Sequence, residues 1–122
     1  MQITNLEIYN YVEKVNKNFT GTEVLPIKLN FYFQKNNKIL MEAMKELEEN
    51  RINIGRKYGT ETEEGFRLDP DKIEEADKEY KELMSLTQEL NLYTIDISTL
   101  PDDLVLTTGQ MDALSYMLKG EI

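Results

Sequence analysis

Two long segments of the chain repeat apolar residues at alternating steps of three and four. The first repeat occupies Phe33, Asn37, Leu40, Met44, Leu47, Arg51, Ile54 and Tyr58. The second occupies Ile73, Ala76, Tyr80, Leu83, Thr87 and Leu90. This spacing is typical of helices packed side by side. A short acidic loop separates the two repeats, so the pattern predicts an antiparallel helical hairpin.

Helix-start signals place these helices at about residues 26–58 and 70–91. Pro26 suits the first position of a helix, where its missing N–H costs nothing. Asp69 suits an N-cap, and Pro70 suits the position after it. The first helix would be about 50 Å long at a rise of 1.5 Å per residue, which exceeds the diameter of a small globule. Part of it must therefore project from the body or pair with a partner.

Charged residues beside the loop support the antiparallel arrangement. Three bases lie at the end of the first helix: Arg51, Arg56 and Lys57. Three acids lie in the first turns of the second: Asp71, Glu74 and Glu75. Folding the helices back on each other would place these bases beside these acids, and it would place the acids at the positive end of the helix dipole.

The segments outside the hairpin predict a small head with a minor β element. Thr4 and Glu7 form a capping-box pattern before an apolar face, which predicts a helix over about 5–18. The alternation of Leu6 and Ile8 leaves a short strand as an alternative there.

Residues 92–97 alternate and are rich in β-branched side chains, so they predict a strand. A lone strand is unstable. It needs a partner, for which the candidates are Thr22–Leu25 and Phe66–Leu68.

Aromatic residues at the start of the long helix indicate where the head lies. The triplet Phe31-Tyr32-Phe33 spans about 200° of a helix, so this turn should be surrounded by other elements. Thr107 and Gln110 form a second capping-box pattern, which predicts a last helix over about 108–118. Three apolar side chains of that helix would point inward: Met111, Leu114 and Leu118.

Together these elements predict a mainly α fold in one domain over residues 1–122. It comprises a long antiparallel helical hairpin with a small head of two short helices and a minor β element. The head would contain about residues 1–35 and 92–122, and the hairpin arm about 36–91. The far end of the arm, near Gly59–Gly65, would be an exposed tip.

Composition removes several classes of chemistry. The 122-residue chain has no Cys and no His. Disulfides, thiolate zinc sites and cysteine nucleophiles are therefore excluded, as is the commonest general base. The start of the chain has no signal-peptide pattern, and no apolar run approaches the length of about 18 residues that spans a bilayer. We therefore expect no membrane association and a cytoplasmic location.

The charge is strongly negative and unevenly distributed. The net charge is −9, with five Lys against three Glu in residues 1–40 and nine basic against twenty acidic residues in 41–122. Such a surface argues against direct nucleic-acid binding, which needs Lys and Arg to displace counterions. It suits a protein partner with a basic surface.

The acidic run Asp69–Glu82 has two interpretations. It holds seven acids against three Lys. It could mimic a phosphate backbone aimed at a nucleic-acid-binding partner, or it could be a solvated helix face with pairs such as Glu74–Lys78, which we favour. The candidate partner-binding residues extend over this run and the loop before it: Glu61, Glu63, Glu64, Phe66, Arg67, Glu74, Glu75 and Asp77.

No catalytic, cofactor or metal site is predicted. Three carboxylate groupings invite a metal interpretation: Asp69/Asp71, Glu74/Glu75 and Asp102/Asp103. None matches a specific metal-binding spacing, and helix N-terminal charges or a turn explain them better. Ser85, Ser98 and Ser115 have no His to activate them. We therefore expect a protein that is not an enzyme.

Three polar residues stand where apolar residues are expected along the long helix. Asn30, Asn37 and Arg51 would specify helix register if they were buried, at a cost in stability. Alternatively, this face is only partly covered. We favour partial exposure for Arg51 and leave both interpretations open for the Asn pair.

The stretch from Leu25-Pro26 to Lys57-Tyr58-Gly59 and the later TIDISTLPDDLVLTTGQMDALSYML resemble a family of small proteins from phages and prophages of Gram-positive bacteria. In that family Leu-Pro opens a long helix, and Glu-x-x-Arg and Lys-Tyr-Gly close it; here Glu48 and Arg51 match the former. The resemblance covers about residues 25–118. The sequence departs from the family pattern in the aromatic triplet and in the early Asn residues of the long helix.

The resemblance implies a viral accessory protein of unknown activity, with no catalytic residues to transfer. We expect a function in protein–protein interaction, with a host or phage protein as partner. A sharper hypothesis is inhibition of a host enzyme or antiviral defence protein through the acidic helical surface. The alternative is a morphogenesis or replication accessory protein that self-associates as a homo-oligomer or chaperones a phage protein.

Overall fold

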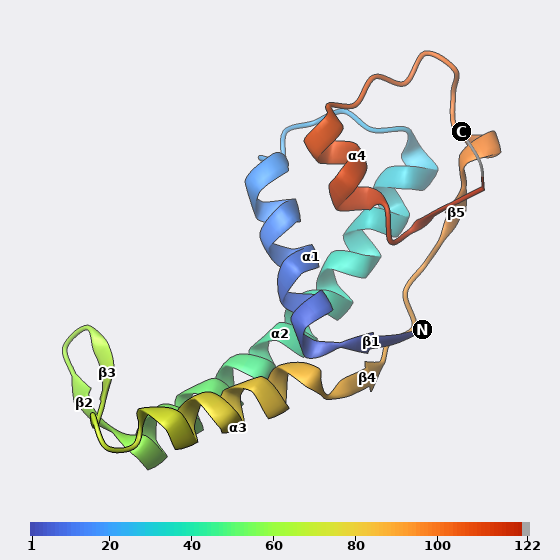
Figure 1. The fold of residues 1–122 in the computed structure, drawn as a ribbon. Helices are drawn as coiled ribbons and strands as arrows, with labels where there is room; N and C mark the ends of the chain where they lie inside the picture. The colour runs from blue at the N-terminus through green and yellow to red at the C-terminus, as the bar shows by residue number, and fades with distance from the viewer. Residues whose placement is uncertain (121–122) are drawn as a thin grey trace.

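The computed structural model describes residues 1–120 and has a mainly α-helical fold built along one long helix (Figure 1). α2 (Ile27–Tyr58) begins in a compact head, and its C-terminal part projects from that head. α3 (Ile73–Ser85) folds back beside the projecting part, so the two form an arm. The predicted long antiparallel hairpin is therefore confirmed.

The remaining elements are short and lie before, at the end of, and after the arm. They are β1 (Gln2–Thr4), α1 (Asn5–Asn18), β2 (Gly59–Thr62), β3 (Gly65–Leu68), β4 (Thr87–Glu89), β5 (Ile95–Asp96), a 3-10 turn (Ile97–Thr99), α4 (Thr108–Leu114) and β6 (Leu118–Lys119). Three two-stranded pairs join β1 with β4, β2 with β3 and β5 with β6.

Local capping groups decide where two of the helices start. The Glu7 backbone N–H donates to Thr4 Oγ1 over 3.1 Å, and the Thr4 N–H donates back to Glu7 Oε1 over 3.2 Å. Thr107 and Gln110 form the same reciprocal pair at the start of α4. Both predicted capping boxes are therefore confirmed. Each pair satisfies N–H groups that have no partner inside the helix.

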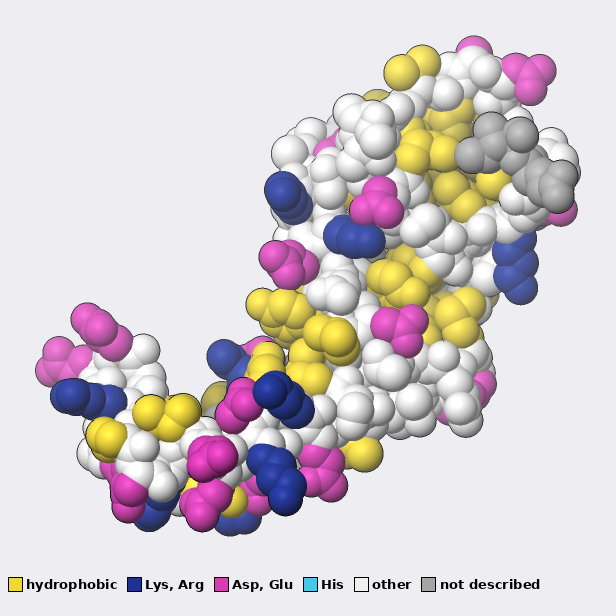
Figure 2. All heavy atoms as spheres, in the orientation of Figure 1, with side chains coloured by type: hydrophobic (Ala, Val, Ile, Leu, Met, Phe, Trp, Pro, Cys, Tyr) yellow, Lys and Arg dark blue, Asp and Glu magenta, His cyan; other side chains and the backbone are white. Residues whose placement is uncertain are grey.

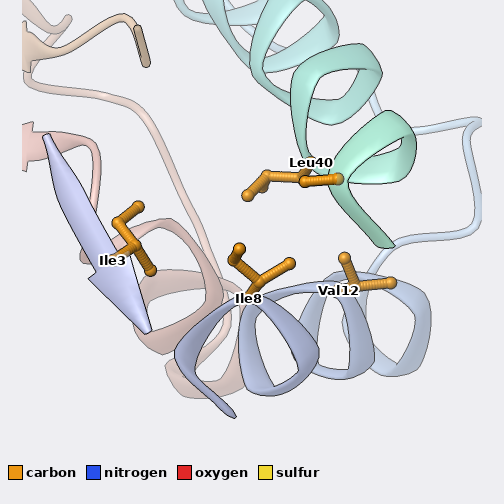
Figure 3. Close-up of a cluster of buried hydrophobic side chains, with 5 residues drawn as sticks. Ile3, Ile8, Val12 and Leu40 are labelled. Carbon is orange, nitrogen blue, oxygen red and sulfur yellow. The ribbon is translucent and has the colours of Figure 1, made fainter. Parts of the chain in front are cut away.

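Two buried clusters form the core of the head. In the first, Ile8 and Val12 of α1 point toward Leu40 of α2, and Ile3 of β1 lies beside them (Figure 3). Ala43 completes this cluster, so the head core extends further along α2 than the predicted boundary at residue 35. The second cluster joins α2, β5, α4 and the turn after α4, and it consists of Leu29, Phe33, Ile95, Leu114 and Met117.

The face of α2 that is buried differs from the predicted repeat. The buried positions are Leu29, Phe33, Asn36, Leu40, Ala43, Leu47 and Gly55. The buried polar residue is therefore Asn36, and Asn37 is only partly buried. Arg51 is exposed and pairs with Glu48 of its own helix over 3.0 Å, as the partial-exposure interpretation expected. Phe31 also departs from prediction, since it is 52% exposed while Phe33 is buried.

α3 is shorter than predicted at both ends. It ends at Ser85, where Asn5 binds backbone carbonyls of its last turn and of the residue just after it. The Asn5 N–H donates to Leu86 O over 2.9 Å, and Asn5 Nδ2 donates to Leu83 O over 2.8 Å. The following residues then pair with β1, which places buried Ile3 opposite Gln88.

The start of α3 also moves, from the predicted residue 70 to Ile73. Asp69 is not its N-cap. The Asp69 carbonyl accepts from the Lys72 N–H over 2.8 Å, so residues 69–72 form a turn before the helix. The loop before it, predicted as a short acidic loop, contains the β2–β3 hairpin.

The predicted strand over 92–97 is mostly wrong. Only Ile95–Asp96 is strand, and neither candidate partner pairs with it. Its partner is β6, in parallel, with Ile95 opposite Leu118. The last helix ends at Leu114, before the predicted residue 118. After it the chain turns, which places Met117 in the core and lets the next residues pair as β6.

Candidate functional site

The tip of the arm is a tight β-hairpin that carries acidic side chains. Thr62 pairs with Gly65, and Glu63 and Glu64 form the turn between them. Gly65 takes up a φ of +126°, a left-handed conformation that favours glycine, and its carbonyl accepts from Thr62 Oγ1 over 3.0 Å. The turn geometry thus leaves the two glutamates exposed at the end of the molecule.

Phe66 holds this hairpin against α2. A Cβ atom placed on Gly55 would lie 2.8 Å from the Phe66 ring, so the ring lies directly on the bare glycine backbone. Gly55 is buried and Phe66 is partly buried. The structure therefore gives Phe66, a candidate partner-binding residue, a contact within the chain, and it places Arg67 in an exposed position opposite Thr60.

The acidic side chains of the distal arm have few internal partners. Eight acids and two bases occupy residues 59–77, and Figure 2 shows acidic side chains at the hairpin and along the arm. Asp69 lies 3.8 Å from Lys72, and Asp77 lies 2.9 Å from Lys81. Among residues 1–120, six of the eight have no Lys or Arg nitrogen within 4.0 Å: Glu61, Glu63, Glu64, Asp71, Glu74 and Glu75.

Most carboxylates of the distal arm lie on two elements, the β2–β3 hairpin and the first turns of α3, and Figure 1 shows both elements in the arm. Glu61, Glu63 and Glu64 lie on the hairpin, which we call the arm tip. Glu74, Glu75 and Asp77 lie on the first turns of α3 and are exposed. The solvated-face interpretation of the acidic run is confirmed for Asp77, which pairs with a lysine four residues later. The pair named in that interpretation, Glu74–Lys78, does not form.

One ion pair crosses between the two helices of the arm. Lys57 Nζ lies 2.6 Å from Glu79 Oε1, whereas none of the three acids predicted to face the basic end of α2 forms such a pair. Since α3 begins three residues later than predicted, Lys57 faces its second turn. The hydrogen bond from Lys57 lowers the pKa of Glu79, and the same bond raises the pKa of Lys57.

Among the grooves on the surface of residues 1–120, two lie beside α2, and sequence reasoning missed both. A groove of about 280 Å³ follows the α2–α3 contact and contains the Lys57–Glu79 pair. It is lined by Asn50, Asn53, Ile54, Lys57, Glu79, Glu82, Leu83 and Leu86. A second of about 240 Å³ lies between α1 and α2 and is lined by Val12, Val15, Asn16, Asn37, Leu40 and Met41. The polar Asn37 in the predicted repeat was the one sequence signal of the second groove.

Neither groove places a hydroxyl nucleophile beside a base. In residues 1–120, no three Asp or Glu side chains converge as a metal site would require. None of the helices in this range is long and apolar enough to cross a membrane. The arm carries exposed carboxylates on the β2–β3 hairpin and on α3.

A comparison of the chain with protein-family models, curated proteins and solved structures found no match.

Proposed function

We propose that the protein acts without chemistry of its own, by binding a protein partner through the acidic distal arm. The observation that carries this proposal is the set of unpaired carboxylates at the arm tip and on the first turns of α3. Carboxylates left without internal partners attract a basic surface and steer its approach. Because Phe66 holds the hairpin on α2, the tip keeps its charges in a defined arrangement before binding.

The finer proposal follows the family resemblance of the sequence. In it, the chain is a phage accessory protein in the cytoplasm of a bacterial host, and its partner is a host enzyme or an antiviral defence protein with a basic groove. The length of the arm supports this proposal. Beyond Ala43, the last α2 residue of the head core, α2 continues for 15 residues, or about 22 Å, so the tip can enter a groove while the head stays outside.

Affinity capture from a bacterial lysate tests this function. We expect the immobilised chain to retain a basic protein that Glu63→Gln/Glu64→Gln loses. The matched control is Asp102→Asn/Asp103→Asn, which removes the same charge from an exposed turn of the head and should keep the partner. A captured protein that binds both variants equally would contradict the role of the arm.

A second candidate is self-association through the arm helices. Ile73 and Tyr80 occupy predicted repeat positions on α3 but are 50% and 37% exposed. Exposed apolar side chains at helical spacing are a feature of surfaces that pair with another helix. In this case Ile73→Ser/Tyr80→Ser would abolish association of the purified protein, and high salt would leave the association of the wild type intact.

A further inference from the structure

The exposed face of α2 in the head carries a basic and apolar patch. Since each residue turns a helix by about 100°, five exposed side chains lie within an arc of about 100° opposite the buried face. These residues, which we call the head patch, are Ile27, Lys28, Phe31, Lys35 and Lys38. Ile27 is 86% exposed, and Val24 just before the helix is 95% exposed.

The lysines of the head patch have no acidic partners. In residues 1–120, none of the three has a carboxylate oxygen within 4.0 Å. The chain carries no acid between Glu23 and Glu42. Glu23 is occupied elsewhere, since its carboxylate accepts from the Thr20 backbone N–H, which lowers its pKa. The patch is therefore locally positive in a chain whose net charge is −9.

Aromatic contacts hold the patch in place. Lys35 Nζ lies 5.4 Å from the centre of the Phe31 ring, and Lys28 Nζ lies 5.7 Å from the centre of the Tyr32 ring. The Tyr32 ring lies 5.2 Å from that of Tyr93, whose backbone is bound by Asn36. Such contacts orient the ammonium groups while leaving them in solvent.

The head patch and the arm tip are complementary but lie at opposite ends of α2. About 40 Å of continuous helix separates Phe31 from Tyr58, at a rise of 1.5 Å per residue. Figure 1 shows the hairpin far from the head. The two surfaces therefore cannot meet within one chain, and their complementary charges can pair only between copies.

We propose that the arm tip of one copy binds the head patch of a second copy. The carboxylates of Glu61, Glu63 and Glu64 meet the patch lysines, and Leu68 at the hairpin base, 36% exposed, offers an apolar contact for Phe31. This inference goes beyond the proposed function, because it needs no other protein.

The contact uses different surfaces on the two copies, so it links chains head to tip. It is small compared with the 1,200–2,000 Å² of a typical stable interface, so we expect it to be transient and dependent on concentration. The net charge of −9 also opposes association at long range. Because the screening length is about 10 Å at 0.1 M salt and about 3 Å at 1 M, contact pairs persist at the lower concentration and fade at the higher one.

Sedimentation equilibrium of the purified chain tests the proposal. The average mass should rise above that of one chain with increasing concentration in 0.1 M salt and return to it in 1 M salt. Lys28→Glu/Lys35→Glu and Glu63→Lys/Glu64→Lys should each weaken this association by at least about tenfold, since they place like charges opposite each other. Circular dichroism checks that each variant folds. If Lys28→Glu/Lys35→Glu does not fold, Lys28→Gln/Lys35→Gln removes the same two positive charges without adding negative ones.

Mixing the two charge-reversed variants gives the decisive result. The lysine-reversed chain keeps its acidic tip, and the tip-reversed chain keeps its basic patch, so together they should form a one-to-one complex. Combining all four changes in one chain should restore self-association. Asp102→Lys/Asp103→Lys, which matches the net charge of the tip variant, should associate no less than the wild type.

Three outcomes would overturn the proposal. The first is a wild-type chain that stays monomeric at about 1 mM in 0.1 M salt, a concentration at which contacts of about −4 kcal/mol are half-formed. The second is association that survives both charge reversals or 1 M salt, which would indicate that the copies associate through the apolar face of α3. The third is binding of a single-stranded oligonucleotide or of anionic vesicles by the head patch without self-association.

Discussion

Asn36 shows how one side chain can fix a segment that has no regular structure of its own. Its Nδ2 donates to Tyr93 O over 2.8 Å, and its Oδ1 accepts from the Tyr93 N–H over 2.7 Å. The Asn36 side chain is fully buried, and residues 90–94, which include Tyr93, form neither helix nor strand. The amide thus replaces the partners that a sheet would otherwise supply.

Replacing Asn36 should cost more stability than replacing its neighbour. Asn36→Ala removes both bonds and leaves the Tyr93 backbone without partners, so we expect a loss of about 2–3 kcal/mol in the free energy of unfolding. Asn37→Ala is the matched control, because Asn37 is only partly buried, and it should change that free energy by less than about 0.5 kcal/mol. Urea denaturation of both variants measures the difference, and equal losses would argue against the role of Asn36.

Tyr116 is the opposite case, a buried polar group without a hydrogen bond. Its ring stacks on Tyr11 with centres 4.7 Å apart, and no hydrogen-bond partner lies within reach of its hydroxyl oxygen among the described residues. Burial raises its pKa to about 12; the nearby Asn36 amide opposes this rise, although it forms no hydrogen bond with the hydroxyl. The charged tyrosinate is thus disfavoured in the folded protein.

This burial predicts a specific loss of stability in alkali. The unfolded chain releases the Tyr116 proton near the usual pKa of 10.0 and the folded chain near about 12, so stability is lost as the pH rises from 10 to 12. Two pKa units correspond to about 2–3 kcal/mol. Tyr116→Phe should lack this part of the loss while stacking as before. Denaturation of both proteins at pH 9 and pH 12 tests it, and parallel declines would refute it.

At the scale of elements, the arm tip depends on one glycine–aromatic contact. Gly55 weakens α2 by roughly 1 kcal/mol relative to Ala, yet a Cβ there would press on the Phe66 ring. Glycine at this position therefore lowers the helix propensity of α2, but it leaves the space in which Phe66 attaches the β2–β3 hairpin.

A double-mutant cycle should show a change of sign at this position. Gly55→Ala should destabilise the wild-type chain, because the Phe66 ring must shift. In the Phe66→Ala background only the Cβ of residue 66 stays close, at 3.1 Å, and a small shift of the hairpin relieves it, so the same change should stabilise the chain by up to roughly 0.5–1 kcal/mol through helix propensity. Unfolding free energies of the four chains measure the coupling. An identical effect of Gly55→Ala in both backgrounds would mean that the ring contact has no energetic weight.

Sequence reasoning located the boundaries that depend on neighbouring residues better than those that depend on distant parts of the chain. Thr4 and Thr107 cap their helices through residues three positions away, so a short window contains the whole signal. The end of α3 instead depends on Asn5, about eighty residues distant, and β5 depends on β6 near the end of the described chain. Hydrophobic periodicity carries no information about such partners.

The candidate site was predictable only in part, for the same reason. The exposed acids of the arm tip follow from local composition. Burial of Asn36 in place of Asn37, and exposure of Phe31, follow from which elements cover α2. That information lies in the tertiary arrangement, and it is the exposure of Phe31 that reveals the head patch.

Over the whole molecule, packing is uneven. Both clusters of buried side chains lie in the head, and α1, α2, β5 and α4 supply most of their members. In the arm, buried residues are few, and the Lys57–Glu79 pair is exposed to solvent, where an ion pair contributes little. The arm should therefore open locally more often than the head.

Hydrogen exchange in native conditions tests this difference. We expect amides of α3 and of the last two turns of α2 to exchange about tenfold to a thousandfold faster than those near Leu40, since local opening costs less than global unfolding. Mass spectrometry of proteolytic fragments resolves the two regions. Uniform protection along α2 would show instead that arm and head unfold as one unit.

The arm leaves and rejoins the head at neighbouring places, because α3 ends where Asn5 binds it and β4 pairs directly with β1. Its length is therefore independent of the head. Seven more residues in each helix would extend it by about 10 Å while keeping the facing side chains aligned to within about 20°. The arm thus fixes the distance between the head and the tip, and a lengthened arm would place the same tip farther from the same head.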